Sequence, residues 1–420
     1  MWPLNNKPLG AIAVLSCAGV MAASAAAVAT DWLGFRNDGR SVAAAGELPT
    51  TWNVETGENV AWQVDLPGRG VSSPVVVDGR VIVTSSSGPK RDRLHITAYD
   101  ANTGDCLWNR QLWATGRTLV HPTSAVAANT PVSDGELIFA FFSSNDLVAL
   151  DLDGNVKWIR GLIENYPLAG NDVGMSSSPV VAGDVVVVQS ESHAESFVAA
   201  YRKADGAAVW QIDRPHAPTW CSPIAITSSV DGRDVQAVVI QAGDGYSVRR
   251  ADDGTEIWSQ GIPCATTPSA VFADYLYLPA NGLQAVSYDS AAGEVKSEWS
   301  ESRLQPGSAS PVIHEGRAYV INGGGVLTCS TVGSGKIDWR LRLGGSFWAT
   351  PVIAGDRLVA INQNGKAYLV AIGDSKDPPA GKLVGECEFG EQVLASPAVV
   401  DGGLFVRSYE RLWKLQAAAP

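Results

Sequence analysis

The sequence is poor in charged residues, and basic residues are the scarcer kind. Charged residues make up 18% of the 420 positions, with 31 Lys and Arg against 43 Asp and Glu and a formal net charge of −12. A surface with this balance repels a phosphate backbone, so we expect no nucleic-acid partner. The 45% hydrophobic content, with 43 Gly, 23 Pro and 14 Trp, argues against disorder or a coiled coil and favours strands and turns.

Paired cysteines and familiar catalytic motifs are absent as well. None of the six cysteines forms a Cys-x-x-Cys pair, which gives no support to a structural zinc site. A disulfide between Cys221 and Cys264 remains an open alternative. The sequence also lacks a Gly-x-Ser-x-Gly elbow, a His-Glu-x-x-His pair and a Walker loop, so we predict no catalytic residues and no metal site.

The N-terminus has the pattern of a secretory signal peptide. Lys7 is the only charge among the first 29 residues, and residues 9–29 are small or apolar throughout. The run ends in Ala27-Val28-Ala29, which is typical of a cleavage site. We predict a signal peptide over residues 1–29 and a mature chain, residues 30–420, exported to the periplasm or cell envelope.

Two alternatives stay open for this segment. The apolar run approaches the length of a membrane span, so an uncleaved anchor is one of them. Val14-Leu15-Ser16-Cys17 is close to a lipobox, and a lipid on Cys17 is the other. No other segment is apolar for long enough to span a membrane, so this lipid is the only membrane association that we expect of the mature chain.

A Ser-Pro or Thr-Pro pair followed by a short apolar run recurs along the whole chain. After Pro74 the run predicts a strand, Asp78-Gly79 a tight turn, and residues 81–83 the second strand of a hairpin. Each unit continues with a third strand, a glycine turn and a tryptophan. The prolines of the eight units are Pro74, Pro131, Pro179, Pro223, Pro268, Pro311, Pro351 and Pro397.

The repeat predicts an all-β fold built as an eight-bladed β-propeller. Each unit holds four antiparallel strands in about 45 residues, which is the period of a propeller blade. The last unit, which begins at Ser396, ends after a third strand at residues 412–414. Residues 56–62 repeat the missing turn, strand and tryptophan, so we predict that this N-terminal strand completes the last blade.

Most units carry a tryptophan a fixed distance after the glycine turn. We interpret these side chains as structural wedges between blades, because an indole buries a large area and can donate one hydrogen bond. In the seventh unit, Gly385-Glu386-Cys387 stands where tryptophan is expected. The wedge residues are Trp62, Trp108, Trp158, Trp210, Trp258, Trp299 and Trp339.

One unit carries a resemblance to a known repeat. The stretch Ala98-x-Asp100-x-x-Thr103-Gly104-x-x-x-Trp108 resembles the tryptophan-docking motif of PQQ-like, quinoprotein-type propeller repeats. The resemblance covers almost the whole mature chain. The sequence is similar to the family that includes the outer-membrane assembly lipoprotein BamB, and especially to the secreted single-propeller members of that family.

The resemblance implies a non-catalytic scaffold or interaction protein of the cell envelope. The alternative within the same family is an oxidoreductase that binds PQQ with calcium. Such enzymes typically use adjacent cysteines, and this chain has no Cys-Cys pair. A third function, from a different class, is a propeller that binds a glycan or another small molecule.

The length variation among units falls in the connections between second and third strands and between successive blades, which emerge on one face of a propeller. Long loops on a rigid scaffold are the usual place for binding, so we expect a protein partner or small ligand there. Trp220 and Trp348 lie outside the wedge position, and their rings could stack on a ligand. The candidate binding residues are Arg69, His121, Asn129, Asp172, Trp220, Arg303, Phe347 and Trp348.

Overall fold

The computed structural model describes residues 1, 31–43, 48–170, 172–373 and 381–417. Apart from Met1, the predicted signal peptide lies outside these residues, and so do Lys7 and Cys17. In the described part of the chain, no helix has both the length and the apolar character that crossing a membrane requires.

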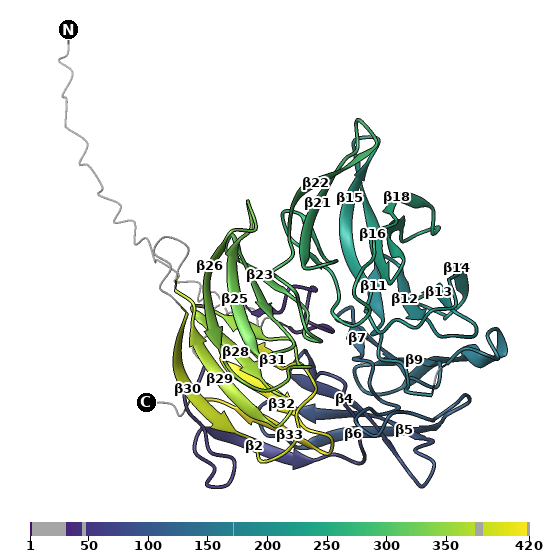
Figure 1. Ribbon diagram of the computed structural model, residues 1–420. Helices are drawn as coiled ribbons and strands as arrows, with labels where there is room; N and C mark the ends of the chain where they lie inside the picture. The colour runs from purple at the N-terminus through teal and green to yellow at the C-terminus, as the bar shows by residue number, and fades with distance from the viewer. Residues whose placement is uncertain (2–30, 44–47, 171, 374–380, 418–420) are drawn as a thin grey trace.

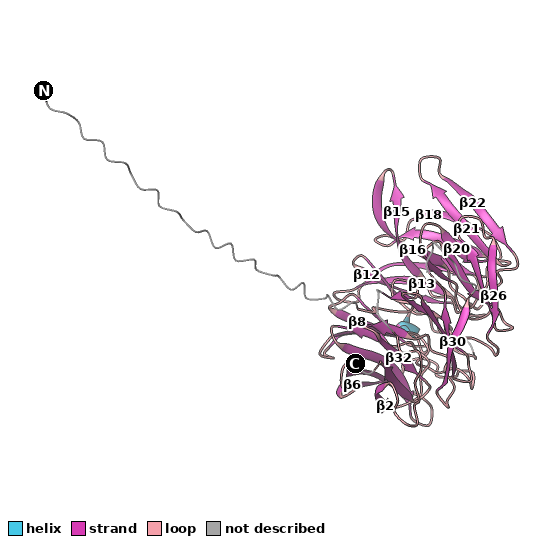
Figure 2. Ribbon diagram, turned by 90° about the vertical axis from the view of Figure 1, so that its left-hand side faces the viewer, coloured by secondary structure: helices cyan, strands magenta, loops and turns pink. Residues whose placement is uncertain are grey.

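The described residues form eight sheets that follow one another around a ring (Figure 1). Within these residues, helical structure is limited to a single 3-10 turn, η1 (Leu162–Glu164), drawn in cyan in Figure 2. Strands innermost in neighbouring sheets contact one another, as β3 does with β7 and β31. The prediction of an all-β, eight-bladed propeller with four-stranded antiparallel blades is confirmed.

In blades 1 to 6 the strands run outward from the centre in chain order. In blades 1 to 4 they are β3 (Val75–Val77), β4 (Arg80–Ser87), β5 (Arg93–Asp100) and β6 (Cys106–Trp113); β7 (Val132–Ser133), β8 (Leu137–Phe141), β9 (Asp146–Asp151) and β10 (Val156–Gly161); β11 (Val180–Ala182), β12 (Val185–Ser190), β13 (Phe197–Arg202) and β14 (Ala208–Asp213); and β15 (Ile224–Val230), β16 (Arg233–Ala242), β17 (Gly245–Arg250) and β18 (Glu256–Gln260).

Blades 5 to 8 repeat the pattern, with two contributions from the N-terminal part of the chain. Their strands are β19 (Val271–Phe272), β20 (Leu276–Pro279), β21 (Leu283–Asp289) and β22 (Glu294–Glu301); β23 (Val312–His314), β24 (Arg317–Ile321), β25 (Val326–Thr331) and β26 (Ile337–Arg342); β27 (Val352–Ala354), β28 (Arg357–Ile361), β29 (Lys366–Ala371) and β30 (Lys382–Glu388), with β1 (Val42–Ala43) added in parallel to β27; and β31 (Ala398–Val400), β32 (Gly403–Arg407) and β33 (Arg411–Leu415), completed by β2 (Val60–Asp65).

The ring closes where β2 pairs with β33. The two strands are antiparallel, from Val60 opposite Leu415 to Asp65 opposite Arg411. Figure 1 shows β2 at the purple end of the chain beside β33 at the yellow end. The predicted closure of the last blade by the N-terminal strand is therefore confirmed, and it holds together strands about 350 residues apart.

Asp-Gly pairs form the inner hairpin turns of blades 1, 4 and 8. At Asp78 and Gly79 both residues have positive φ, 46° and 70°, as a two-residue type I′ turn requires. Asp231-Gly232 and Asp401-Gly402 repeat this geometry. These tight turns keep one face of the ring compact and leave the longer connections to the other face.

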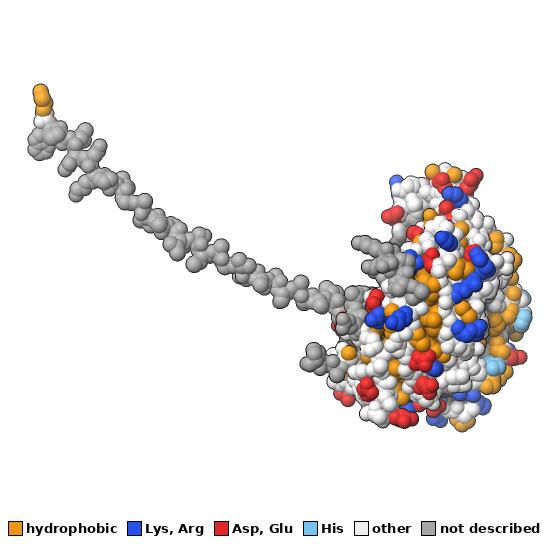
Figure 3. Space-filling view, turned by 60° about the vertical axis from the view of Figure 1, so that its left-hand side comes forward, with side chains coloured by type: hydrophobic (Ala, Val, Ile, Leu, Met, Phe, Trp, Pro, Cys, Tyr) orange, Lys and Arg blue, Asp and Glu red, His pale blue; other side chains and the backbone are white. Residues whose placement is uncertain are grey.

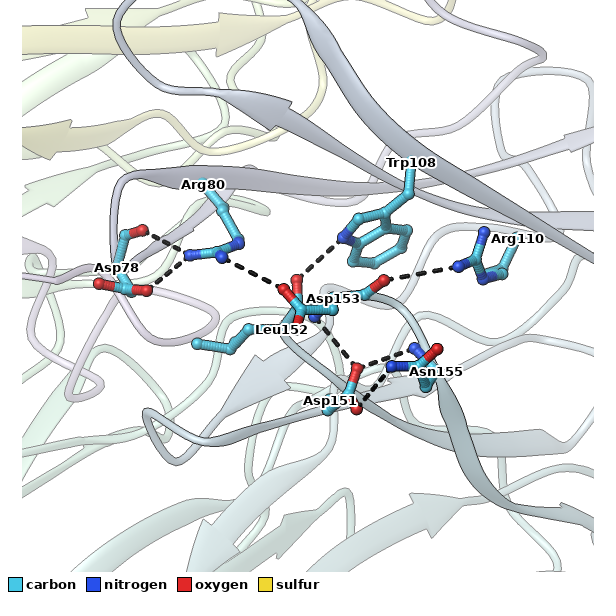
Figure 4. A network of polar contacts seen from close by, with 8 residues as sticks. All are labelled: Asp78, Arg80, Trp108, Arg110, Asp151, Leu152, Asp153 and Asn155. Carbon is cyan, nitrogen blue, oxygen red and sulfur yellow. Dashed lines mark hydrogen bonds and ion pairs between the residues drawn. The ribbon is translucent and has the colours of Figure 1, made fainter.

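A tryptophan on the outermost strand of one blade packs on the next blade. In Figure 4, Trp108 of β6 donates its indole N–H to the carbonyl oxygen of Leu152, at 2.9 Å. The ring lies so close to Gly154 that a Cβ there would come within 2.6 Å of it. Arg110 on the same strand donates to the Gly154 carbonyl at 2.6 Å. Glycine is required at this turn because its φ is +78° and its α-carbon faces the indole.

The same contact recurs around most of the ring. A β-bulge beside each tryptophan sets its side chain inward on an otherwise exposed strand, as between Trp108 and Cys106. The indole N–H groups of Trp62, Trp158, Trp210 and Trp299 donate to the carbonyls of Ala101, Lys203, Ala251 and Val332 in the following blade.

Two interfaces depart from this pattern. Trp258 stacks on Tyr288 at 5.3 Å, and Gly293, two residues further from its tryptophan than in the other blades, contacts no indole. Trp339 lies against Gly381 instead. The indole N–H groups of Trp258 and Trp339 have no acceptor among the described residues.

Blade 7 fills its missing wedge from elsewhere in the chain. Gly385, opposite Leu369, occupies the position that tryptophan has in the other blades, and Thr50 lies directly against it. Trp52 is buried there, packs on Phe389 at 5.7 Å and donates its backbone N–H to the sulfur of Cys387. A tryptophan is thus present at this interface, supplied by the N-terminal segment.

Candidate functional site

A ring of hydroxyl groups encircles the channel at the start of each blade. The backbone N–H of Ser73 donates to the Thr130 hydroxyl, and six more such bonds continue from blade to blade as far as the Ser396 hydroxyl, at 2.8 to 3.2 Å. This hydroxyl ring consists of Ser73, Thr130, Ser178, Ser222, Ser269, Ser310, Thr350 and Ser396. The Ser-Pro and Thr-Pro pairs therefore have a structural role that the sequence analysis did not assign.

Blade 5 uses a different residue from the one that the repeat indicated. The pair Thr267-Pro268 marks this unit in the sequence, but Ser269, after the proline, supplies the ring hydroxyl. The proline is displaced by two positions relative to the ring in this blade. Blade 5 therefore has its hydroxyl at the same place in the ring as the other blades, although its proline lies at a different place.

The hydroxyl ring lines a cavity of about 460 Å³ at one mouth of the channel. Residues from all eight connections between blades contribute to its wall, including Val71, His121, Val173 and Leu394. We call the face formed by these connections the loop face: residues 66–74, 114–131, 162–179, 214–223, 261–270, 302–311, 343–351 and 389–397. The volume lies within the roughly 300–1,000 Å³ typical of small-molecule sites.

The N-terminal segment closes the floor of this cavity. Residues 32–41 contact blade 1 through Trp32 and Val76, blade 5 through Arg36 and Ala270, and blade 7 through Ser41 and Pro351. The segment therefore crosses the channel before it pairs with β27 as β1. Phe35 lines both the cavity above the segment and a second cavity of about 410 Å³ below it.

Three of the eight candidate binding residues line the cavity. Trp348 is 46% exposed and donates its indole N–H to the Gln363 side chain at 3.1 Å. Trp220 donates its own to the Gly174 carbonyl at 2.9 Å. His121 stands at the rim with its Nδ1 2.7 Å from the Thr123 hydroxyl. The indole N–H groups of Trp348 and Trp220 are therefore bound to protein acceptors, and these bonds lie in the ring planes, so they do not cover the aromatic faces.

Two candidates are buried behind the cavity wall. Asn129 is fully buried and donates its side-chain amide to the Ser177 carbonyl at 2.6 Å. Phe347 is buried against Tyr368, with ring centroids 6.1 Å apart. Neither side chain reaches a surface that a ligand could contact.

The remaining three candidates lie on the loop face outside the cavity wall. Arg69 covers the ring of Tyr409 at 3.6 Å and donates to the carbonyls of Pro122 and Ser124. Asp172 pairs with Arg117 at 2.9 Å, and Arg303 pairs with Glu301 through two contacts of 2.7 and 2.8 Å. These charges are paired at the surface and do not converge on one ligand.

The buried cysteines are free thiols. Burial raises the pKa of Cys264 to about 12 and raises that of Cys221 further, so both stay protonated at neutral pH. A nucleophilic cysteine needs the opposite shift. The disulfide between Cys221 and Cys264 is not present, and neither thiol has the character of a catalytic group.

A buried ion pair lies beside the loop face. Arg214 contacts Glu191 at 2.7 Å, and burial raises the pKa of this carboxyl although the guanidinium opposes the shift. Gln189 also donates to Glu191, at 3.1 Å. Both contacts are to Oε1 and come from blade 3 or the residue directly after it, and Glu191 lies outside the cavity wall, so the pair holds the end of blade 3 together and does not face the cavity.

The cavity wall does not fit PQQ with calcium. Calcium takes oxygen ligands that include carboxylates, and none of the residues lining the cavity is Asp, Glu, Lys or Arg. Across the described ranges, no three His, Cys, Asp or Glu residues are grouped closely enough to hold a metal. PQQ is an anionic quinone, and this cavity wall offers it neither a Lys or Arg side chain nor a set of calcium ligands.

We expect no oxidase or dehydrogenase activity with this cofactor. The purified chain, supplied with PQQ and Ca²⁺, should give dye-linked oxidation of alcohols and sugars no faster than the cofactor alone. A known quinoprotein dehydrogenase reconstituted in parallel is the positive control. Saturable oxidation by this chain would contradict the conclusion that the cavity does not fit PQQ with calcium.

The family model described as outer membrane protein assembly factor BamB matches residues 21–173, 167–274 and 285–377. The outer membrane protein assembly factor BamB of Yersinia pestis is 23% identical over 327 residues, which cover 75% of this chain and 67% of the relative. BamB from Moraxella catarrhalis, a solved structure, has a TM-score of 0.60 at 15% identity, over 86% of this chain and 98% of that one.

Quinoprotein enzymes share the fold as well. The quinohemoprotein alcohol dehydrogenase of Comamonas testosteroni has a TM-score of 0.64 at 13% identity, over 93% of this chain and 81% of that one. At this identity the likeness concerns the propeller alone. Since the family model covers well over half of the sequence and its matches run through the blades, the chain belongs to the PQQ-like propeller family of the outer membrane protein assembly factor BamB.

Proposed function

We propose that this protein is a non-catalytic scaffold of the cell envelope that binds a protein partner on its loop face. The relatives are named as outer membrane protein assembly factors, so the proposed partner is a protein of that assembly process. Export to the periplasm or envelope is part of the proposal and follows from the predicted signal peptide.

The observation that carries this proposal is the exposed apolar surface at the end of β6 and on the connections that follow blades 1 and 2. Trp113 is 62% exposed, Leu119 56% and Leu168 63%, and all three lie at the ends of blades 1 and 2. Exposed apolar patches on a rigid scaffold are typical of protein-binding sites, and aromatic residues are enriched in them. The loop face therefore offers a hydrophobic contact to a partner.

The two connections are packed against each other and present one surface. The backbone N–H of His121 donates to the Val173 carbonyl at 3.2 Å, and Arg117 pairs with Asp172. On the side of the molecule drawn in Figure 3, acidic and basic side chains are interspersed with apolar ones. On that side the described residues form no continuous cationic field.

Site-specific photo-crosslinking tests the proposal. The full chain is expressed in the cells that naturally produce it, with a photoreactive residue in place of Leu119 or Leu168. Both positions should give the same discrete adduct with a protein of outer-membrane assembly. The matched control position is Val209, which is 38% exposed on the outer strand β14. Adducts that are absent at both loop positions, or equal to those at Val209, would contradict the proposal.

A further inference from the structure

The cavity at the channel mouth has a chemistry that the scaffold function does not use. Thirteen of its 21 lining residues are serine or threonine, and none is Asp, Glu, Lys or Arg. A charged ligand would lose its hydration there without gaining a counter-ion. The wall therefore favours an uncharged ligand that is rich in hydrogen-bonding groups.

The hydroxyl ring is organised to donate. The oxygens of seven of its members already accept a backbone N–H from the preceding blade. None of the ring hydroxyls donates its proton to another described residue. An oxygen that accepts one hydrogen bond polarises its own O–H, so the ring presents donors to the oxygen atoms of a ligand.

Aromatic faces complete the site. Trp220 and Trp348 line the cavity from blades separated by two others, and Phe35 stands in the floor. Both indole N–H groups are bound to protein acceptors, which fixes the ring planes and leaves their faces available. Flat apolar faces beside a circle of hydroxyl groups suit a molecule with apolar C–H faces and polar edges.

We infer that this cavity binds a small uncharged saccharide, which stacks on Trp348 and Trp220 and bonds to the hydroxyl ring. The N-terminal segment closes the floor, so a polysaccharide cannot pass through the channel. The ligand is a free sugar or the end of a glycan chain. The cavity shares the connections of His121 and Val173 with the proposed partner-binding surface, but the exposed Trp113, Leu119 and Leu168 do not line it.

Calorimetric titration of the full chain tests the inference. Glucose, N-acetylglucosamine, maltose and cellobiose are the neutral probes, with glucuronic acid and glucose 6-phosphate as charged counterparts and an array of glycan ends as a second format. We expect saturable binding of at least one neutral probe at millimolar concentration and much weaker binding of its charged counterpart. Absence of binding by every neutral probe and glycan end, or preference for the charged sugars or for PQQ, would overturn the assignment.

Variants at Trp348 locate the site. Trp348→Ala should weaken the affinity about tenfold or more, as expected for loss of a stacked aromatic contact. Trp348→Phe keeps an aromatic face and should retain most of the affinity. Leu107→Ala, an exposed position on β6 away from the cavity, is the control and should bind as the wild type does. Equal affinity in Trp348→Ala, with an unchanged melting temperature, would also overturn the assignment.

Discussion

Trp108→Ala is expected to lower the free energy of unfolding by about 3–5 kcal/mol. The side chain is only 9% exposed and packs between blades 1 and 2, where it contacts Gly154 and donates to the Leu152 carbonyl. Truncation removes this buried area, leaves a cavity that the rigid turn cannot fill, and deprives the Leu152 carbonyl of its indole donor. Chemical denaturation followed by circular dichroism measures the change.

Trp113→Ala on the same strand is the matched control. Trp113 is 62% exposed, and its contact with Arg93, 5.6 Å from the ring centroid, is at the surface. We expect a loss of no more than about 1 kcal/mol, because exposed cation–π contacts contribute little. Equal losses in the two variants would show that the tryptophans do not act as wedges between blades.

The number of blades and the closure of the ring could be predicted from the sequence because both depend on a local repeat. Each unit carries its own turns, and the last unit ends one strand short. Pairing of β2 with β33 completes that unit. A propeller blade contacts only its neighbours, so a pattern within about 45 residues is enough to define the architecture.

The floor of the candidate site could not be predicted, because it depends on contacts without a repeat. Residues 32–43 have no counterpart elsewhere in the chain, and their partners lie in blades 1, 2, 5 and 7. Trp52 likewise fills the interface at Gly385 from more than 300 residues away. No local pattern connects such segments to their partners.

The sequence also could not predict which loop side chains point toward the solvent and which are buried. Phe347 and Trp348 are adjacent in one connection, yet Phe347 is 3% exposed and Trp348 is 46% exposed. Asn129, next to the ring residue Thr130, is also buried. A signal for the site was nevertheless present, since a hydroxyl residue recurs at the start of every blade. The sequence analysis used these residues only to mark the repeat and named none of them as a binding residue.

Two buried arginines give the second large expected effect. Arg407 is fully buried, and its guanidinium donates to the Ser72 hydroxyl and the Thr84 carbonyl at 2.9 and 2.7 Å. It also donates to the carbonyls of Ser408 and Tyr409. Position 70 requires glycine, because a Cβ there would lie 2.6 Å from the Arg407 guanidinium. These contacts join blade 8 to blade 1 at the closure of the ring.

Arg36 is equally buried but much less satisfied. It donates to the Ala270 carbonyl at 3.0 Å, while its Nε and Nη1 have no partner among the described residues. Burial lowers the pKa of both guanidinium groups, to about 10 for Arg36 and about 9 for Arg407, which reflects the cost of holding a cation away from water. Arg407 offsets this cost with four hydrogen bonds to described residues, whereas Arg36 makes one such bond.

The two positions should therefore respond in opposite ways to the same substitution. Arg407→Met is expected to lower the free energy of unfolding by about 2–4 kcal/mol, because buried acceptors lose their donors. Arg36→Met removes an uncompensated charge at the loss of one hydrogen bond, so we expect stability to be unchanged or to rise by about 1–2 kcal/mol. Urea denaturation of both variants at neutral pH measures the difference. A large loss in Arg36→Met would mean that the segment crossing the channel depends on this cation, and that its unpartnered nitrogens bind something that stabilises the fold.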